Sequence, residues 1–251
     1  MQNELPVPKC YDNPADATRR LVEMFVEMGQ ARRTRNAPST EAARAVFRKV
    51  HGVAYGSFER AADLPEAWKV GIFAHERLDA WMRFSSDAAP TDADLGTTLG
   101  IGIKLFGVPG QKALGEDGNT ADLIMQNASR FFVDDAKTMV EFTYAGVVQK
   151  DYDSYLAKHK VTRDILNAMT APRGSVLTST YWAILPFHLG DTIIQYRLWP
   201  ETPPEDVADD GTDYLATDMI NRLHERDYRF RLQVLERTDP DRMPLDQATV
   251  E

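Results

Sequence analysis

The hydrophobic residues near the start of the chain follow a helical period. Leu21, Phe25 and Met28 recur at i, i+4 and i+7, which predicts an amphipathic helix with one apolar stripe. Asn13 followed by Pro14 predicts where this helix begins, because asparagine caps helices well and proline suits the first helical position. We therefore expect the first part of the chain to be helical.

From about residue 50 the pattern changes to the two-residue period of strands. Ile101, Ile103 and Leu105 alternate with Gly102 and Lys104, so the three large apolar side chains are expected to share one face of a strand. Short segments rich in β-branched and aromatic residues, bounded by turn residues, predict strands at 51–59, 70–73, 81–85, 99–108, 122–126, 176–185, 193–199 and 228–235.

Helical patterns return between the two groups of predicted strands. Asp134 and Asp135 are expected to cap a helix that reaches about Gln149. An acidic, proline-containing loop is expected over 200–213. Further helices are expected at 153–159, at 162–169 and after residue 213, where Leu215, Met219, Ile220 and Leu223 share one face.

Two groups of antiparallel strands with helices between them predict an α+β fold, an antiparallel β-barrel with flanking helices. The helices do not alternate with the strands, which disfavours a Rossmann sheet. The sequence also lacks a P-loop, a GxGxxG element and a GxSxG element. We expect a single domain, with an N-terminal helical arm over residues 1–45 and the barrel with its helices over 46–251.

Composition and charge narrow the classes of partner. The chain has 251 residues, is 43% hydrophobic and carries a formal net charge of −9. An acidic surface argues against nucleic acid and anionic membranes. No run of about 20 apolar residues is present, and the first residues lack a secretion signal, so a cytoplasmic protein acting on small molecules is expected. The single cysteine, Cys10, excludes an intrachain disulfide and a cysteine-based metal site.

One histidine stands out as a candidate for chemistry. The chain has 5 histidines, and none is spaced at i, i+4 from another, so no helical two-histidine metal site is predicted. His51 begins a β-rich segment and is flanked by apolar residues. By its sequence context alone, a buried structural histidine remains the alternative to a catalytic one. His188 is expected in a turn.

Four further residues look suited to binding or positioning. Arg83 and Ser85 are expected to point to one face of a strand, since the side-chain period is two. Arg48 and Arg83 are candidate anion ligands, with ordinary ion pairing as the alternative. Asn127 directly follows an apolar strand and precedes an aromatic pair, where a turn residue is the alternative.

Taken together and in order, several segments resemble the catalase family. They are FRKVHGVAYGSFE (47–59), WMRFSSD (81–87), LGIGIKLFG (99–107) and DLIMQNASRFFVDDAKTMVEF (122–142). The flanking segments are similar to those of a subgroup, the compact catalase-like haem proteins; they are residues 20–38, 179–190, 196–204 and 229–250. The resemblance implies a catalase-like antiparallel β-barrel with flanking helices and a bound haem b.

The resemblance also implies roles for individual residues. His51 matches the distal histidine, Asn127 the distal asparagine, and Ser85 the serine that orients the histidine. Haem contacts are implied for Arg48 and Arg83 at the propionates, Val50 beside the distal face, Phe132 of the aromatic pair, and Met139, where the family has a stacking phenylalanine.

These roles imply a haem-dependent hydroperoxidase that acts on hydrogen peroxide or on organic or lipid hydroperoxides. His51 would act as a general base, taking a proton from one peroxide oxygen and delivering it to the other. Asn127 would hydrogen-bond the peroxide. A neutral imidazole is needed for this role, and burial favours that state. A homo-oligomer is left open.

The iron ligand of the family is a tyrosinate that follows an arginine by four positions. No arginine of this chain has tyrosine four positions later. Family members continue beyond the segment that matches MPLDQATV, so the C-terminal part of the fold and the ligand are expected to lie outside residues 1–251. The alternative is a haem-free catalase-like barrel without peroxidase activity: a truncated product, a pseudoenzyme or a small-molecule binder.

Overall fold

A computed structural model of the chain describes residues 14–36, 44–112, 118–204, 206 and 211–250. It divides into two compact units, each of which is described by itself. The helical unit comprises Met1–Arg48, Arg130–Ala168 and Met243–Glu251, and the sheet unit comprises Lys49–Ser129 and Met169–Arg242. This division differs from the predicted arm and barrel, because the helices after residue 130 group with the N-terminal helix.

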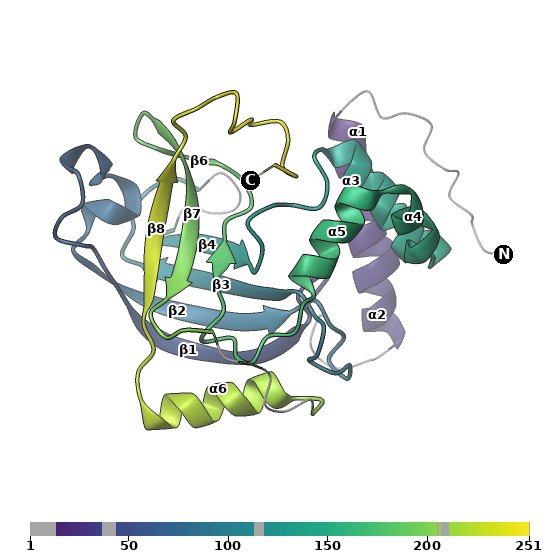
Figure 1. Ribbon diagram of the computed structural model, residues 1–251, viewed down its shortest axis with the longest axis horizontal. Helices are drawn as coiled ribbons and strands as arrows, with labels where there is room; N and C mark the ends of the chain where they lie inside the picture. The colour runs from purple at the N-terminus through teal and green to yellow at the C-terminus, as the bar shows by residue number, and fades with distance from the viewer. Residues whose placement is uncertain (1–13, 37–43, 113–117, 205, 207–210, 251) are drawn as a thin grey trace. The chain divides into compact units, whose positions relative to one another are not determined.

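The helical unit contains a continuous N-terminal helix and four shorter helical segments (Figure 1). The first helix extends over the predicted residues, but its central part has π-helical geometry, and its predicted cap, Asn13, lies outside the described residues. The segments are α1 (Pro14–Val22), η1 (Glu23–Gln30), α2 (Ala31–Asn36), α3 (Ala136–Thr143), η4 (Tyr144–Gln149), α4 (Tyr152–Lys158) and α5 (Lys160–Met169).

A small apolar cluster joins the first helix to α3. Ala17 and Met24 are buried against Val140, with Leu21 and Met28 packed beside them. Leu21 and Met28 therefore belong to the apolar stripe as predicted. The third member is Met24 and not the predicted Phe25. The cap predicted for the later helix is confirmed, because the Asp135 carboxylate accepts a hydrogen bond from the Thr138 backbone N–H at 2.7 Å.

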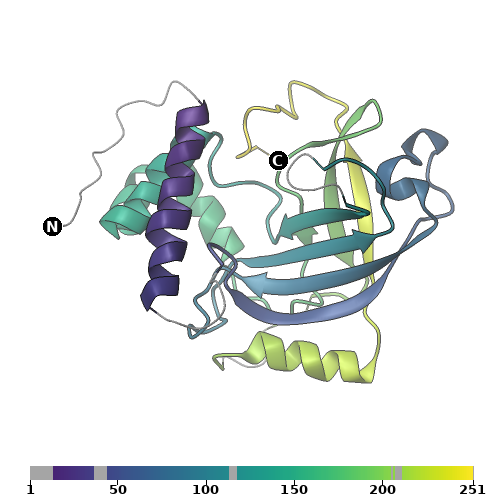
Figure 2. The same ribbon diagram turned by 180° about the vertical axis from the view of Figure 1, so that it is seen from behind.

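The sheet unit is built on an eight-stranded antiparallel sheet that curls into a half-barrel (Figures 1 and 2). The strand order is β1-β2-β3-β4-β5-β7-β6, and β8 pairs with β7. The strands are β1 (Lys49–Glu59), β2 (Arg77–Ser86), β3 (Leu99–Phe106), β4 (Thr120–Gln126), β5 (Tyr181–Trp182), β6 (Phe187–Leu189), β7 (Thr192–Pro200) and β8 (Phe230–Glu236). This confirms the predicted α+β class with a curled antiparallel sheet.

Alternating side chains from the strands form the core of the sheet unit. Ile101 and Leu105 of β3 are buried there together with Phe84 of β2. The even-numbered apolar residues of β8 pack against the same core, as their alternation predicts. The helix α6 (Tyr214–Glu225) contacts β1, and Leu215 adds to the core. Ile220, which is predicted on the same face as Leu215, is 55% exposed, so the prediction is wrong for this residue.

Three local predictions are wrong. The predicted strand at 70–73 is instead a short 3-10 helix, η3 (Gly71–Ala74), which follows another, η2 (Glu66–Trp68). Most of the predicted strand at 176–185 is irregular, because the Ser175 and Ser179 hydroxyls bond to nearby backbone groups and compete with strand pairing. His188, expected in a turn, lies in β6.

Candidate functional site

His51 occupies the irregular position of the β1–β2 ladder. Val50 pairs with Ser85, and the next pair joins Gly52 to Phe84, so His51 is the additional residue of a β-bulge. A bulge turns the side chain of the inserted residue away from the regular alternation of the strand. The imidazole is directed into the protein and is fully buried, whereas the side chain of Val50 before it is 48% exposed.

The imidazole of His51 faces a buried carboxylate. Its Nδ1 atom lies 3.7 Å from Oδ1 of Asp94, and both side chains have no exposed surface. Within the described part of the chain, neither ring nitrogen has a hydrogen-bond partner. Burial lowers the pKa of His51, and the charges of Lys49 and Arg83 act in the same direction, while Asp94 opposes them. The imidazole is therefore neutral at pH 7, with lone-pair and N–H capacity unused.

A buried ion pair holds the carboxylate that faces the histidine. The Lys49 ammonium lies 2.7 Å from Asp94 Oδ1 and 3.0 Å from Asp213 Oδ1, and it donates to the backbone oxygens of Asp92 and Thr212 at 2.6 Å each. Burial alone would lower the pKa of Lys49, but the hydrogen bonds to the two carboxylates outweigh it and raise that pKa. The lysine is therefore charged and fully satisfied by these acceptors.

Sequence reasoning missed both members of this ion pair. Lys49 precedes His51 by two residues, and a lysine at the inward position of a strand signals a buried acidic partner. Asp94 carries no such signal, because only the folded loop between β2 and β3 brings it to β1. Its second oxygen accepts the backbone N–H of Leu215 at 2.9 Å, in the first turn of α6.

Arg83 and Ser85 share one face of β2, as the alternation predicts. Arg83 donates from Nη1 to Ser85 Oγ at 2.7 Å, and Ser85 Oγ makes a long contact of 3.5 Å to the Gly100 oxygen. The resemblance implies that Ser85 orients His51, but here its hydroxyl contacts Arg83 instead. The role of Ser85 toward the histidine stays a prediction.

The side chain of Asn127 is tied to the backbone at both ends of its amide. Its Oδ1 accepts the Leu99 N–H at 3.0 Å, and its Nδ2 donates to the Met169 oxygen at 2.8 Å. The amide is buried and keeps one N–H for a further acceptor. Asn127 therefore has a structural role at the start of β3, and its contact with a peroxide stays a prediction.

The strand registers bring the predicted catalytic residues to one end of the sheet. Lys49, next but one to His51, pairs with Ser86, the neighbour of Ser85. Ser86 in turn pairs with Leu99, whose amide group binds Asn127. His51, Ser85 and Asn127 therefore all lie at the end of the sheet where β1 and β3 begin and β2 and β4 end.

Three predicted haem contacts belong to the helical unit. Arg48 is its last residue before β1, and its charge lowers the pKa of the partly buried Arg33, in addition to the larger effect of burial. Phe132 is buried between Phe131 and the ring of Phe142, with centroid distances of 4.4 and 4.7 Å. Met139 lies in α3 and is half-buried. Their contacts with a haem stay predictions.

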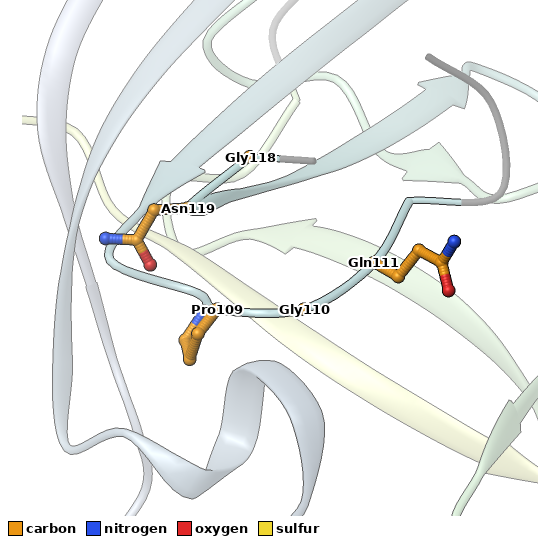
Figure 3. A pocket seen from close by; sticks show the side chains of 5 residues that line it. All are labelled: Pro109, Gly110, Gln111, Gly118 and Asn119. Atoms are coloured by element: carbon orange, nitrogen blue, oxygen red, sulfur yellow. The ribbon is translucent and has the colours of Figure 1, made fainter. Parts of the chain in front are cut away.

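The sheet unit also has a surface hollow that contains no candidate catalytic residue. A shallow hollow is lined by Pro109, Gly110, Gln111, Gly118 and Asn119, beyond the end of β3 (Figure 3). None of these residues is titratable or nucleophilic, so the hollow contains no candidate catalytic group.

Among the described residues, no three His, Cys, Asp or Glu side chains gather as a metal site. The helices within the described residues are too short or too polar to cross a membrane.

Comparison with known proteins identifies the fold. Neither the known protein families nor the curated proteins give a match to the sequence. The structure, however, is similar to the crystal structure of a fungal catalase and to catalase A from Saccharomyces cerevisiae, with a TM-score of 0.64 for each. The identities are 16% and 14%, and the matches cover 99% of this chain and 52% and 54% of those chains.

The chain therefore has a catalase-like fold, as its sequence motifs predict. It spans about half the length of the catalases that it matches.

Proposed function

We propose that the protein is a haem-dependent hydroperoxidase that acts on hydrogen peroxide or on an organic hydroperoxide. The observation that carries the proposal is His51, a fully buried, neutral imidazole at a β-bulge whose ring nitrogens have no partner among the described residues. A buried polar group without a partner is costly, and a catalytic role is one of the recognised reasons for keeping one. In a catalase-like fold, a base that acts on a bound peroxide is such an explanation.

The residues of the sheet unit suit the distal side of a haem. Arg83 places a cation beside Ser85, where it would pair with a propionate, and the half-exposed side chain of Val50 would cover part of the porphyrin. For Arg48, Phe132 and Met139, contact with the haem rests on the sequence resemblance alone. When bound, the haem would supply the iron at which the peroxide bond is cleaved. The residue that would coordinate this iron is not identified, because no arginine of this sequence has tyrosine four positions later.

The protein would contribute proton transfer and orientation. The neutral imidazole of His51 would accept the proton from the –OH oxygen of the hydroperoxide and return it to the other peroxide oxygen, so that the leaving group departs as water or an alcohol. The free N–H of Asn127 would donate to the peroxide and hold it in place. Proton transfer of this kind contributes about 10²–10⁴-fold to the rate.

The test uses the full-length protein produced in cells that supply haem. The proposal expects a Soret band, peroxidase turnover with hydrogen peroxide or cumene hydroperoxide, and a loss of about 10²–10⁴-fold in His51→Ala with haem content unchanged. His224→Ala, an exposed histidine of α6, is the matched control and should keep full turnover. A purified protein without a Soret band would favour the haem-free barrel, and equal turnover of His51→Ala and wild type would refute the role of His51.

The substrate class and the assembly are parts of the same proposal. Parallel assays with hydrogen peroxide and with a fatty-acid hydroperoxide would rank the two substrate classes by kcat/KM. Light scattering of the purified protein would show whether it is a homo-oligomer.

A further inference from the structure

We propose that Asp94 is a positioning residue for His51: its buried carboxylate holds the imidazole with the proton on Nδ1, so that Nε2 carries the free lone pair that accepts the substrate proton. This inference rests on the proposed function for its catalytic meaning, but the tautomer that it assigns is a property of the protein alone. Nothing in the sequence motifs points to Asp94, which lies in the connection between β2 and β3.

The position of Asp94 relative to His51 selects one tautomer. Oδ1 faces Nδ1 at 3.7 Å, and an ionised carboxylate can only accept hydrogen bonds. The favourable state therefore has the hydrogen on Nδ1, because two facing lone pairs would repel each other at this buried position. The separation exceeds a hydrogen bond, and such contacts commonly tighten when substrate is bound. A hydrogen-bond acceptor at one ring nitrogen fixes the chemistry of the other.

The carboxylate is held rigidly enough to impose this choice. Oδ1 is 2.7 Å from the Lys49 ammonium, and Oδ2 accepts the Leu215 N–H at 2.9 Å. These contacts come from β1 and from the first turn of α6, so two separate elements fix the carboxylate on either side. Removal of one partner of a buried ion pair is strongly unfavourable, and the pair therefore resists rearrangement.

The surrounding charges keep the histidine neutral and still able to accept a proton. Asp94 and Asp213 favour protonation of His51, while Lys49 and Arg83 oppose it. Because Lys49 offsets much of the negative charge of Asp94, the carboxylate can orient the ring without converting it permanently to imidazolium. An isolated carboxylate at this position would raise the pKa of the histidine and reduce the population of the free base.

The alternative is that the Lys49–Asp94 pair only fastens β1 to α6. Such a structural role would alter the stability of the protein, but it would not move the proton between the ring nitrogens. NMR of protein labelled with ¹⁵N-histidine separates the two roles, because the nitrogen shifts report the tautomer and the titration gives the pKa. The resonances of His51 are assigned from the spectrum of His51→Gln.

The experiment compares wild type, Asp94→Asn and the matched control Asp213→Asn, without any haem in the assay. We expect Nδ1–H in wild type and in Asp213→Asn, because Asp213 contacts Lys49, whereas the carboxylate that faces the ring is that of Asp94. In Asp94→Asn the amide can donate to Nδ1, so the proton should move to Nε2 and the pKa of His51 should fall. The double variant Lys49→Met/Asp94→Asn removes both buried charges and should show the same change of tautomer if the single variant does not fold.

The tautomer of His51 and the effect of Asp94 on turnover are tested separately. An unchanged tautomer and pKa in Asp94→Asn, or an unchanged tautomer in the double variant, would overturn the role of Asp94 whether or not the protein binds haem. The same change in Asp213→Asn would also overturn it. If the full-length protein has peroxidase activity, Asp94→Asn should lower kcat by roughly 10–100-fold at unchanged haem content, as for other residues that orient a functional histidine.

Discussion

Gly52 of β1 lies against the thioether of Met219 in α6, so closely that a Cβ atom at position 52 would be 2.7 Å from Met219 Sδ. Gly52 directly follows His51, and together with Phe84 of β2 it forms the first regular pair after the bulge. The absence of a side chain therefore lets α6 approach β1 at the point where the strand turns the histidine inward.

A methyl group at this position should separate the helix from the strand. We expect Gly52→Ala to lower the free energy of unfolding by about 1–3 kcal/mol, the usual cost of overpacking. Gly102→Ala is the matched control in β3, since a Cβ there meets nothing within 4 Å. It should change stability by less than about 0.5 kcal/mol. Urea denaturation of the two variants measures the difference, and equal midpoints would contradict the close approach.

The stability of the sheet unit should depend on pH through His51. Its pKa is lowered by burial from the usual value of 6.5, so in acid the unfolded chain binds a proton that the folded protein does not. The free energy of unfolding should therefore fall as the pH decreases from 6.5 toward the lower pKa of the folded state, and level off below it.

This pH dependence is tested by denaturation at a series of pH values. His51→Gln should show a flatter curve between pH 7 and the acidic limit, because it removes the group responsible. His224→Gln, at an exposed site, should retain the curve of the wild type. A wild-type slope that persists in His51→Gln would assign the effect to another group.

The amide of Asn127 should contribute to stability independently of any peroxide. Asn127→Ala leaves the N–H of Leu99 and the oxygen of Met169 without these bonds, which should cost about 1–3 kcal/mol for a buried donor. Asn127→Asp keeps the acceptor for Leu99 and should show which of the two bonds matters more. Asn119→Ala, at an exposed position, is expected to be nearly neutral. Thermal unfolding without haem measures this contribution to stability. An Asn127→Ala variant as stable as the wild type would contradict the prediction.

A protein limited to residues 1–251 should bind haemin weakly or not at all. The sequence offers no tyrosine four positions after an arginine, so iron coordination of the catalase type is not expected. Contact with one porphyrin face alone supplies only apolar burial, at about 25 cal/mol per Å². A haemin titration followed by absorbance measures this. A tight equimolar complex with a tyrosinate-type ferric spectrum would contradict the prediction and identify a ligand within these residues.

Alternation of apolar residues predicted the strand faces well, because burial on one side of a sheet repeats every second residue. It placed Ile101 and Ile103 in the core and put Arg83 beside Ser85. It failed over 176–185, where apolar residues are buried without forming a regular strand. There, hydroxyl groups such as that of Ser179 form hydrogen bonds with the backbone in place of strand pairing. The pattern of hydrophobic residues does not show such hydrogen bonds.

The candidate site was predictable only in part. His51 could be selected from its motif, but the bulge that turns it inward depends on how β1 pairs with β2, which no local pattern specifies. Asp94 lies on a different loop, and its proximity to the ring results from tertiary folding. Lys49 offered the one readable signal, because a cation at an inward strand position requires an acidic partner somewhere in the fold.

The acceptors of Lys49 also order events during synthesis of the chain. Thr212 follows Lys49 by 163 residues, so at about 5–20 residues per second the ribosome needs roughly 8–33 s to supply it. Strands β1 to β4 end at Gln126 and can pair within that interval, before two of the four oxygens that surround the ammonium exist. The contacts around the Lys49 ammonium are therefore completed late, by Thr212 and Asp213 just before α6, and ribosome-bound chains that stop before these residues carry a lysine that lacks two of its acceptors.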